Sequence, residues 1–181
     1  MKETQICTEI IHSLTEQGAW AWKIPDASPM LRAQQRYLPA RAFDIIAVYE
    51  GMPLAIEVKI ITTGGGLSSD RFTQFEVDSL LAAADAHCHA FVAIAYAYKP
   101  GKKALAKGAK KWIRELWMVP IQTWQSAVQR ALANGVKTVP RKVITNMGIA
   151  IPWAGKGIWD FEDFVTREER LHAARYERAV L

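Results

Sequence analysis

The chain has 181 residues, half of them hydrophobic, and a formal net charge of +5. This composition excludes wholesale disorder, and no apolar run reaches the roughly 20 residues that a membrane-spanning helix needs. Two cysteines are too few for a disulfide framework, and the N-terminus lacks the apolar stretch of a signal peptide. We therefore expect a protein of the cytoplasm, or of the host cytoplasm if the sequence is viral, with no membrane partner. The positive charge suggests a polyanionic partner.

The first half of the chain predicts, in order, a helix over residues 3–17, a strand over 19–24, a loop over 25–41, a hairpin of strands over 42–49 and 52–61, a flexible loop over 62–70 and a helix over 71–86. The second half predicts strands over residues 90–98 and 115–121, a helix over 122–134, short strands around Pro140 and Pro152, and a charged helical tail from Asp160. This order predicts a single α/β domain whose central sheet mixes parallel and antiparallel pairs.

Apart from Glu50 in the turn, three charged residues stand in the otherwise apolar hairpin "DIIAVYEGMPLAIEVK", residues 44–59. Gly51 suits the second position of a tight two-residue turn, and that turn sets the register of the two strands. In this register Asp44 lies opposite Glu57, and Lys59 projects from the same face of the sheet. Because burying a lone charge costs several kcal/mol, we expect these side chains to be paired or to bind a metal.

Two adjacent carboxylates repel each other unless a cation lies between them. A hard divalent ion, Mg²⁺ with Mn²⁺ as a substitute, suits the oxygens of Asp44 and Glu57 and keeps several waters. Such an ion activates water and neutralises charge on a phosphoryl group, and Lys59 would stabilise the transition state. The spacing leaves one alternative open, a structural salt bridge of Lys59 with Glu57 or Asp44 at the edge of the sheet.

The motif formed by Asp44, twelve intervening residues and "EVK" at 57–59 resembles the core of the PD-(D/E)xK nucleases, with Phe43 in place of the family's proline. The wider pattern resembles archaeal-type Holliday junction resolvases, including viral or phage-encoded ones. It comprises an N-terminal helix ending near a glycine, the hairpin, a helix carrying Gln74, and the strands "AFVAIAY" and "ELWMVPIQTW". The similarity covers roughly residues 3–124.

This resemblance implies a restriction-endonuclease-like core, a central mixed β-sheet flanked by helices. It implies one nuclease domain over residues 1–181, in which residues 125–181 form a C-terminal extension. It also implies a Mg²⁺-dependent endonuclease that cuts four-way DNA junctions, with Asp44 and Glu57 as metal ligands and Lys59 as a catalytic residue. A C₂ homodimer would supply the paired cuts that a junction with approximate twofold symmetry requires.

The family places a further catalytic carboxylate on the first helix, where Glu3, Glu9 and Glu16 are the candidates. At 100° per residue, Glu3 lies about 20° from Ile10 on the apolar stripe, whereas Glu9 lies about 100° from it. We therefore expect Glu3 to be catalytic, with Glu9 as the open alternative. The spacing from Glu3 to Gly18 and the "E-x-Q-I" start resemble viral-type replication and repair nucleases.

Contacts with DNA phosphates are expected from basic and polar residues on both sides of the hairpin and from the lysine-rich segment "KPGKKALAKGAKKW". These residues are Arg32, Arg36, Arg41, Ser68, Arg71, Gln74, Lys102, Lys103, Lys107 and Lys110. The alternative for the lysines is a solvated loop, and for Gln74 a solvent-facing side chain.

Two further functions remain open from the sequence. A related PD-(D/E)xK nuclease could act on flaps or other DNA of repair and replication. A non-catalytic DNA-binding module is the alternative of another class, although such a module gains nothing from an adjacent pair of carboxylates.

Overall fold

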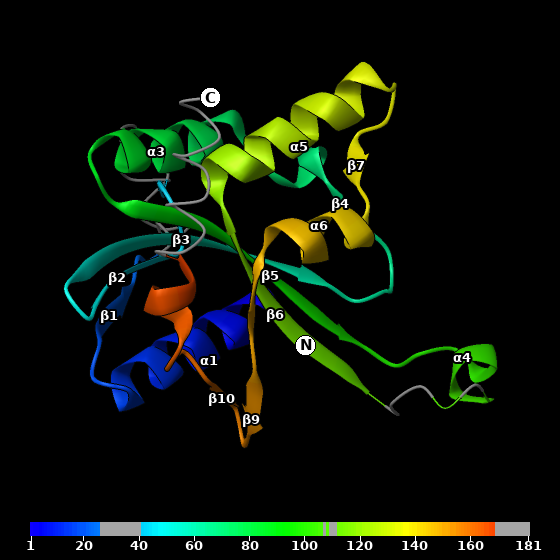
Figure 1. The fold of residues 1–181 in the computed structure, drawn as a ribbon, viewed down its shortest axis with the longest axis horizontal. Coiled ribbons are helices and arrows are strands. Elements are labelled where there is room, and N and C mark those ends of the chain that lie inside the picture. Colours follow the sequence, from blue (N-terminus) through cyan, green and yellow to red (C-terminus); the bar gives the residue numbers. More distant parts are fainter. Residues whose placement is uncertain (26–40, 107, 109–111, 169–181) are drawn as a thin grey trace, which may run out of the picture.

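The structure, a computed structural model, describes residues 1–25, 41–106, 108 and 112–168, and it has the predicted α/β architecture (Figure 1). Its helices are α1 (Glu3–Glu16), the 3₁₀ turn η1 (Ser69–Arg71), α3 (Gln74–Asp85), α4 (Lys102–Ala106), α5 (Ile121–Ala133) and α6 (Arg141–Met147). Its strands are β1 (Trp20–Lys23), β2 (Ile45–Tyr49), β3 (Met52–Ile61), β4 (Leu67–Ser68), β5 (His89–Tyr98), β6 (Ile113–Pro120), β7 (Thr138–Val139), β8 (Ile149–Ile151), β9 (Trp153–Gly155) and β10 (Ile158–Trp159).

The central sheet has six strands in the order β1-β2-β3-β5-β6-β8. Strands β3 and β5 run parallel, while every other neighbouring pair is antiparallel. The parallel pair is connected through α3, as a crossover between parallel strands requires. The prediction of a mixed sheet flanked by helices is therefore confirmed.

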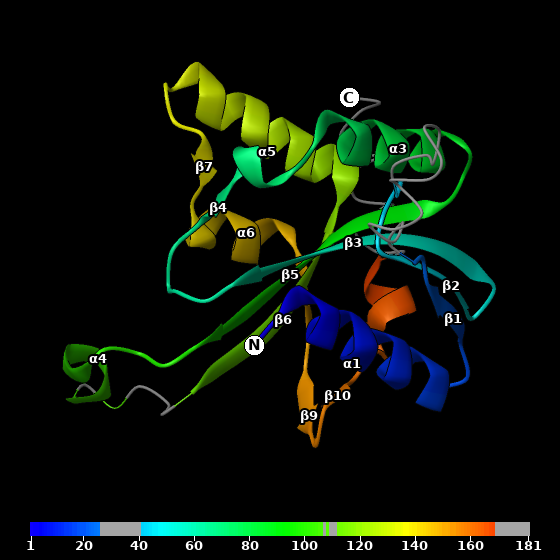
Figure 2. The same cartoon turned by 180° about the vertical axis from the view of Figure 1, so that it is seen from behind.

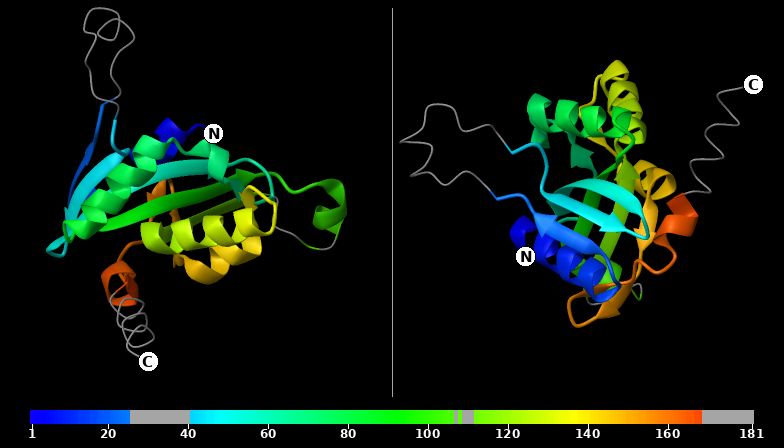
Figure 3. Two further views of the ribbon diagram at one scale, coloured as in Figure 1. Left: turned by 90° about the horizontal axis from the view of Figure 1, so that it is seen from above. Right: turned by 90° about the vertical axis from the view of Figure 1, so that its left-hand side faces the viewer.

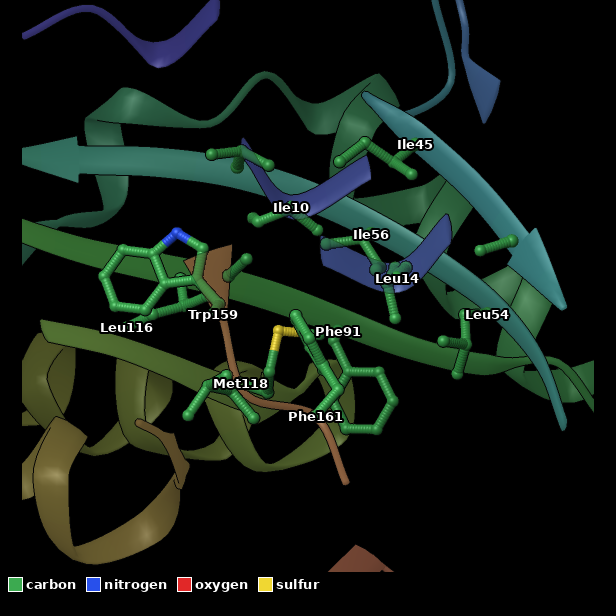
Figure 4. Close-up of a cluster of buried hydrophobic side chains, with 14 of the residues drawn as sticks. Ile10, Leu14, Ile45, Leu54, Ile56, Phe91, Leu116, Met118, Trp159 and Phe161 are labelled. Atoms are coloured by element: carbon green, nitrogen blue, oxygen red, sulfur yellow. The ribbon is translucent and has the colours of Figure 1, made fainter. Parts of the chain in front are cut away.

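Helices cover the two faces of the sheet unequally. Helix α1 lies across one face, whereas α3 and α5 lie on the other (Figures 1 and 2). The α1 side has a core of aliphatic and aromatic residues from α1, the sheet and the segment after β10, including Ile10, Leu14, Ile56, Trp159 and Phe161 (Figure 4). The central strands β3 and β5 are buried on both faces, and this explains their nearly continuous apolar sequences.

The hairpin has the register that its sequence predicts. Tyr49 pairs with Met52, and the pairing continues to Ile45 and Ile56. Both turn residues, Glu50 with φ 48° and Gly51 with φ 80°, have the positive φ of a type I′ turn. A one-residue slip of this register would place the apolar face of β2 in solvent.

Several predicted loops contain regular structure. The segment 62–70, predicted as a flexible loop, includes β4 and η1, because β4 pairs with β7 and Leu67 is buried. A Cβ added at Gly66 would lie 2.1 Å from the carbonyl oxygen of Val139, so only glycine allows this close approach. The short strands predicted around Pro140 and Pro152 are present as β7, β8 and β9. Helix α6, which was not predicted, begins at Arg141 directly after Pro140.

Helix α4 stands apart from the body of the protein, beyond the ends of β5 and β6 and at the opposite end of the molecule from β1 (Figures 1 and 3). Within the lysine-rich segment, Lys102 to Ala106 are helical. Among the described residues, none of the helices is long and apolar enough to cross a membrane.

Candidate active site

The hairpin splits at Asp44, just before β2 begins; beyond this point β3 continues with β5 on one edge and no paired strand on the edge that faces β2. The backbone N–H of Asp44 donates to the carbonyl of Ile56 at 3.0 Å, which is the last ladder bond on this edge of β3. Beyond it, the N–H of Val58 donates to Oδ2 of Asp44 at 2.8 Å, so a carboxylate replaces the missing strand. This bond fixes the Asp44 side chain beside the residue that follows Glu57.

A second carboxylate, that of Glu3, accepts a hydrogen bond from the open edge of β3 two residues after Val58. The N–H of Ile60 donates to Oε1 of Glu3 at 3.2 Å, and the carbonyl of Ile60 accepts a hydrogen bond from Arg71. Arg71 also forms an ion pair with Glu3. Glu3 thus lies at the strand that carries Glu57 and Lys59, although it starts from α1.

Glu57 is fully buried, and only one of its two carboxylate oxygens has a hydrogen-bond partner among the described residues. Its Oε1 accepts a hydrogen bond from Lys59 Nζ at 2.5 Å. Its Oε2 is buried and has no hydrogen-bond partner among the residues that the structure describes. Burial first, and then the charge of Asp44, raise the pKa of Glu57 from 4.5 to about 8. A cation at this oxygen would supply the missing partner and favour the charged form.

Asp44 is nearly buried as well, and its charge is balanced by a guanidinium. Burial raises the pKa of Asp44, against the opposing effects of the Val58 N–H and of Arg41. Nη2 of Arg41 lies 2.7 Å from Oδ1 of Asp44. Arg41, which the sequence suggested as a phosphate ligand, therefore lies in the carboxylate cluster.

Lys59 is held between two carboxylates. Besides Glu57, its Nζ contacts Oε1 of Glu76 at 3.3 Å, and it lies 5.0 Å from the ring centre of Phe72. Burial alone would lower the pKa of Lys59, but Glu57 and Glu76 outweigh burial and raise it above the ordinary value. Lys59 is therefore a fixed positive charge at neutral pH.

Glu76 is the residue of this site that the sequence did not suggest. Its Oε2 accepts from the N–H of Thr73 at 2.6 Å, and its own N–H donates to Thr73 Oγ1, which completes a capping box at the start of α3. The pattern "TQFE" at 73–76 signals such a box, but only the packing of α3 on β3 shows that the carboxylate reaches Lys59.

Cys7, on the buried side of α1, also lies near the carboxylates. Burial first, and then Asp44, raise the pKa of its thiol to about 12. The thiol therefore stays protonated and is no candidate for a nucleophile or a metal ligand.

Glu9, the alternative helix carboxylate, forms an ion pair with Arg114. The guanidinium of Arg114 stacks 3.7 Å from the ring centre of Trp153. These contacts lie in the middle of α1, away from the contact of Glu3 with β3, and give Glu9 a structural role. The choice of Glu3 as the catalytic carboxylate stays a prediction.

The other predicted DNA contacts in the described part of the chain lie on β4, α3 and α4. Ser68 accepts from the N–H of Asp70, and Gln74 hydrogen bonds to Asp78 at 2.8 Å on an exposed part of α3. Lys102 is exposed on α4, far from the carboxylates (Figure 1). Arg32, Arg36, Lys107 and Lys110, and the side chain of Lys103, lie outside the described residues.

The donors available for a metal are two carboxylates. The residues that the structure describes contain no group of three or more histidine, cysteine, aspartate or glutamate side chains arranged to hold an ion. Asp44 and Glu57 nevertheless fit Mg²⁺, because this ion is often bound by one or two carboxylates and keeps its other ligands as water or phosphate oxygens. The unpartnered oxygen of Glu57 is the point at which the site is incomplete.

Comparison with known proteins shows a likeness of fold but no match of sequence. The chain matches none of the protein-family models, and no curated protein sequence matches it. Its structure is similar to that of Hjc, a Holliday junction resolvase from the archaeal hyperthermophile Archaeoglobus fulgidus. The match covers 81% of this chain and 93% of the archaeal chain, with 21% sequence identity and a TM-score of 0.49.

Proposed function

We propose that this protein is a Mg²⁺-dependent endonuclease that cuts branched DNA, with four-way junctions as its principal substrate. The observation that supports it most directly is the buried Glu57, one oxygen of which has no partner among the described residues while the other holds Lys59. Glu57 also lies close enough to Asp44 for the charge of Asp44 to raise its pKa. A purely structural salt bridge does not require a second buried carboxylate next to the pair. Such an arrangement is costly without a cation and is typical of a functional site.

The residues have separate tasks in this proposal. Asp44 and Glu57 would hold Mg²⁺, with Mn²⁺ as a substitute, and Glu3 would orient their surroundings through the edge of β3. When bound, the ion would lower the pKa of a water and neutralise charge on the phosphate that is cut. Lys59, charged and fixed, would donate hydrogen bonds to a phosphate oxygen as negative charge builds up in the transition state.

Glu76 acts in this scheme as a positioning residue. A cation bound at Glu57 would repel the positively charged ammonium of Lys59. The contact with Glu76 would then keep the ammonium of Lys59 in place. The capping box fixes this carboxylate through the Thr73 N–H, so its position depends on the fold of α3 and not on the metal.

The choice of four-way junctions rests on the motif Asp44…Glu57-Val58-Lys59 and on the wider resemblance of the sequence to archaeal-type resolvases. Recognition would use phosphates and branch geometry and not base edges. We propose that the active form is a homodimer, whose two sites make the paired cuts, and that it acts in the cytoplasm.

The test is cleavage of a panel of labelled DNAs, namely a four-way junction, a flap, a nicked duplex and a blunt duplex. We expect Mg²⁺-dependent cleavage of the junction, loss of cleavage in EDTA, and no cleavage by Asp44→Asn, which retains an acceptor for the Val58 N–H. Preferential cleavage of the flap would mean that the substrate is a flap or another DNA of repair and replication and not the four-way junction. Absence of cleavage on all four DNAs, with DNA binding intact, would identify a binding module.

A further inference from the structure

An exposed aromatic surface lies on the same face of the sheet as the carboxylates. Trp20 and Trp22 of β1 are 58% and 63% exposed, and Ile46 and Val48 of β2 are 38% and 42% exposed. Trp20 pairs with Val48, and Trp22 pairs with Ile46, so the four side chains share one face. We call these four residues the tryptophan surface.

The tryptophan surface continues directly into the candidate active site. Side chains two residues apart on a strand point to the same face, so Asp44, Ile46 and Val48 lie in one row. The ladder extends through Asp44, because its carbonyl accepts from the N–H of Ile24 at 2.9 Å. The opposite face of β2, with Ile45 and Ala47, is buried against α1.

The spacing fits a strand of DNA. At about 3.3 Å per residue along a strand and about 4.8 Å between strands, the Cα of Trp22 lies roughly 8 Å from that of Asp44. Trp20 lies about 7 Å farther along β1. Since stacked nucleotides advance about 3.4 Å each, Trp22 is two to three nucleotides from a phosphate bound at Asp44, and Trp20 two nucleotides beyond it.

A second copy of the chain fits this surface less well. Each tryptophan has an area on the order of 250 Å², so the two rings expose roughly 300 Å² together. The aliphatic pair adds less, and stable dimers bury about 800 Å² per partner. Flat, exposed indole rings do match the faces of nucleobases, on which aromatic side chains stack regardless of sequence.

We propose that Trp20 and Trp22 form a stacking platform for unpaired bases of the DNA strand whose phosphate lies at Asp44 and Glu57. The inference rests on the proposed nuclease function and narrows its substrate to DNA with unstacked or single-stranded nucleotides next to the cut. Fully paired duplex offers no free base faces to the platform, so the surface discriminates against it. Branched DNA opened at its branch point provides them.

The experiment measures DNA binding without cleavage, in EDTA, by fluorescence anisotropy. The probes are a blunt duplex and a branched DNA with an unpaired arm, and the variants are Trp22→Ala, Trp22→Phe and Trp20→Ala/Trp22→Ala. Stacking on one aromatic side chain corresponds to roughly 5- to 150-fold in affinity. We expect a loss of this size for Trp22→Ala on the branched probe alone, a larger loss for the double variant, and partial recovery with Trp22→Phe.

Trp112→Ala is the matched control. Trp112 is 57% exposed, like Trp22, but it precedes β6 at the end of the sheet that bears α4 (Figure 1). This variant should keep the wild-type preference for the branched probe over the duplex. Because Trp20 and Trp22 are exposed, all variants should melt at nearly the wild-type temperature.

Two results would overturn the platform. One is equal affinity of the double variant and the wild type for the branched probe. The other is a wild-type dimer in sedimentation that the double variant turns into a monomer, which would make the surface an interface between copies. The readouts separate the two proposals. If the wild type cleaves DNA but Trp22→Ala binds the branched probe as tightly as the wild type, only the platform is refuted. If Trp22→Ala loses affinity for the branched probe but the wild type cleaves no DNA, only the nuclease function is refuted.

Discussion

Replacing Glu57 by glutamine should stabilise the metal-free protein at alkaline pH while it abolishes cleavage. Burial and Asp44 raise the pKa of Glu57 to about 8, so the folded state holds this proton more tightly than the unfolded chain does. The corresponding stabilisation is complete below about pH 4.5 and is lost as the pH rises through about 8. Glutamine stays neutral and keeps this stability at every pH.

The pKa change from 4.5 to about 8 sets the size of the effect. At about 1.36 kcal/mol per pKa unit, the upper limit is on the order of 5 kcal/mol. Lys59 and Arg41 lie in contact with the two carboxylates and can adjust to the charge. We therefore expect about 1 to 3 kcal/mol at pH 9, or roughly 2 to 12 °C in melting temperature for a chain of this size.

The assay is thermal unfolding in EDTA between pH 5 and pH 9 at constant ionic strength. The Glu57→Gln variant should melt above the wild type at pH 9, with a gap that closes toward pH 5. Asp78→Asn, which removes an exposed carboxylate from α3, is the control and should show no such trend. Added Mg²⁺ should stabilise the wild type and leave Glu57→Gln unchanged. A variant that melts below the wild type at pH 9, or a gap that does not depend on pH, would refute the reasoning.

Three further predictions concern the surroundings of the carboxylates. Glu3→Gln should lower the cleavage rate more than Glu9→Gln does. Glu9→Gln should lower the melting temperature more, because the ion pair of Glu9 with Arg114 is more buried than that of Glu3 with Arg71; the reverse order of cleavage rates would assign the catalytic role to Glu9. Glu76→Gln, which can still accept from the Thr73 N–H, should reduce kcat by about 10-fold or more with little change in KM, and an unchanged kcat would mean that Lys59 does not need this contact. Neutralising Lys102, Lys103, Lys107 and Lys110 together should weaken DNA binding and make its salt dependence shallower, by about 0.9 in the log–log slope for each lysine that contacts a phosphate, and an unchanged slope would show that these lysines do not touch DNA.

The sequence predicted the part of the site that depends on local geometry. A two-residue turn and the alternation of apolar residues leave only one register for the hairpin, so the placement of Asp44 opposite Glu57 followed from the sequence. Lys59 followed from the same alternation.

The contacts that the sequence did not suggest join residues far apart in the chain. Glu76 reaches Lys59 only because α3 packs on β3, and Arg71 reaches Glu3 across 68 positions. Arginines near the hairpin were expected on DNA, and charge alone cannot distinguish a phosphate from a buried carboxylate as the partner. The pairing of β4 with β7 has the same origin, because strands of two residues carry no periodicity.

The open edge of β3 affects how a protein with the proposed nuclease activity could lose that activity over evolutionary time. The charge of Glu57 weakens the metal-free fold, so a lineage released from the need to cut DNA can replace this residue and gain stability. Asp44 is different, because its oxygen accepts the hydrogen bond of the Val58 N–H. A side chain without an acceptor would leave that buried group unpaired, at a cost of about 1 to 3 kcal/mol. An inactive descendant should therefore lose Glu57 early, while position 44 keeps an aspartate, an asparagine or another acceptor long after cleavage has gone.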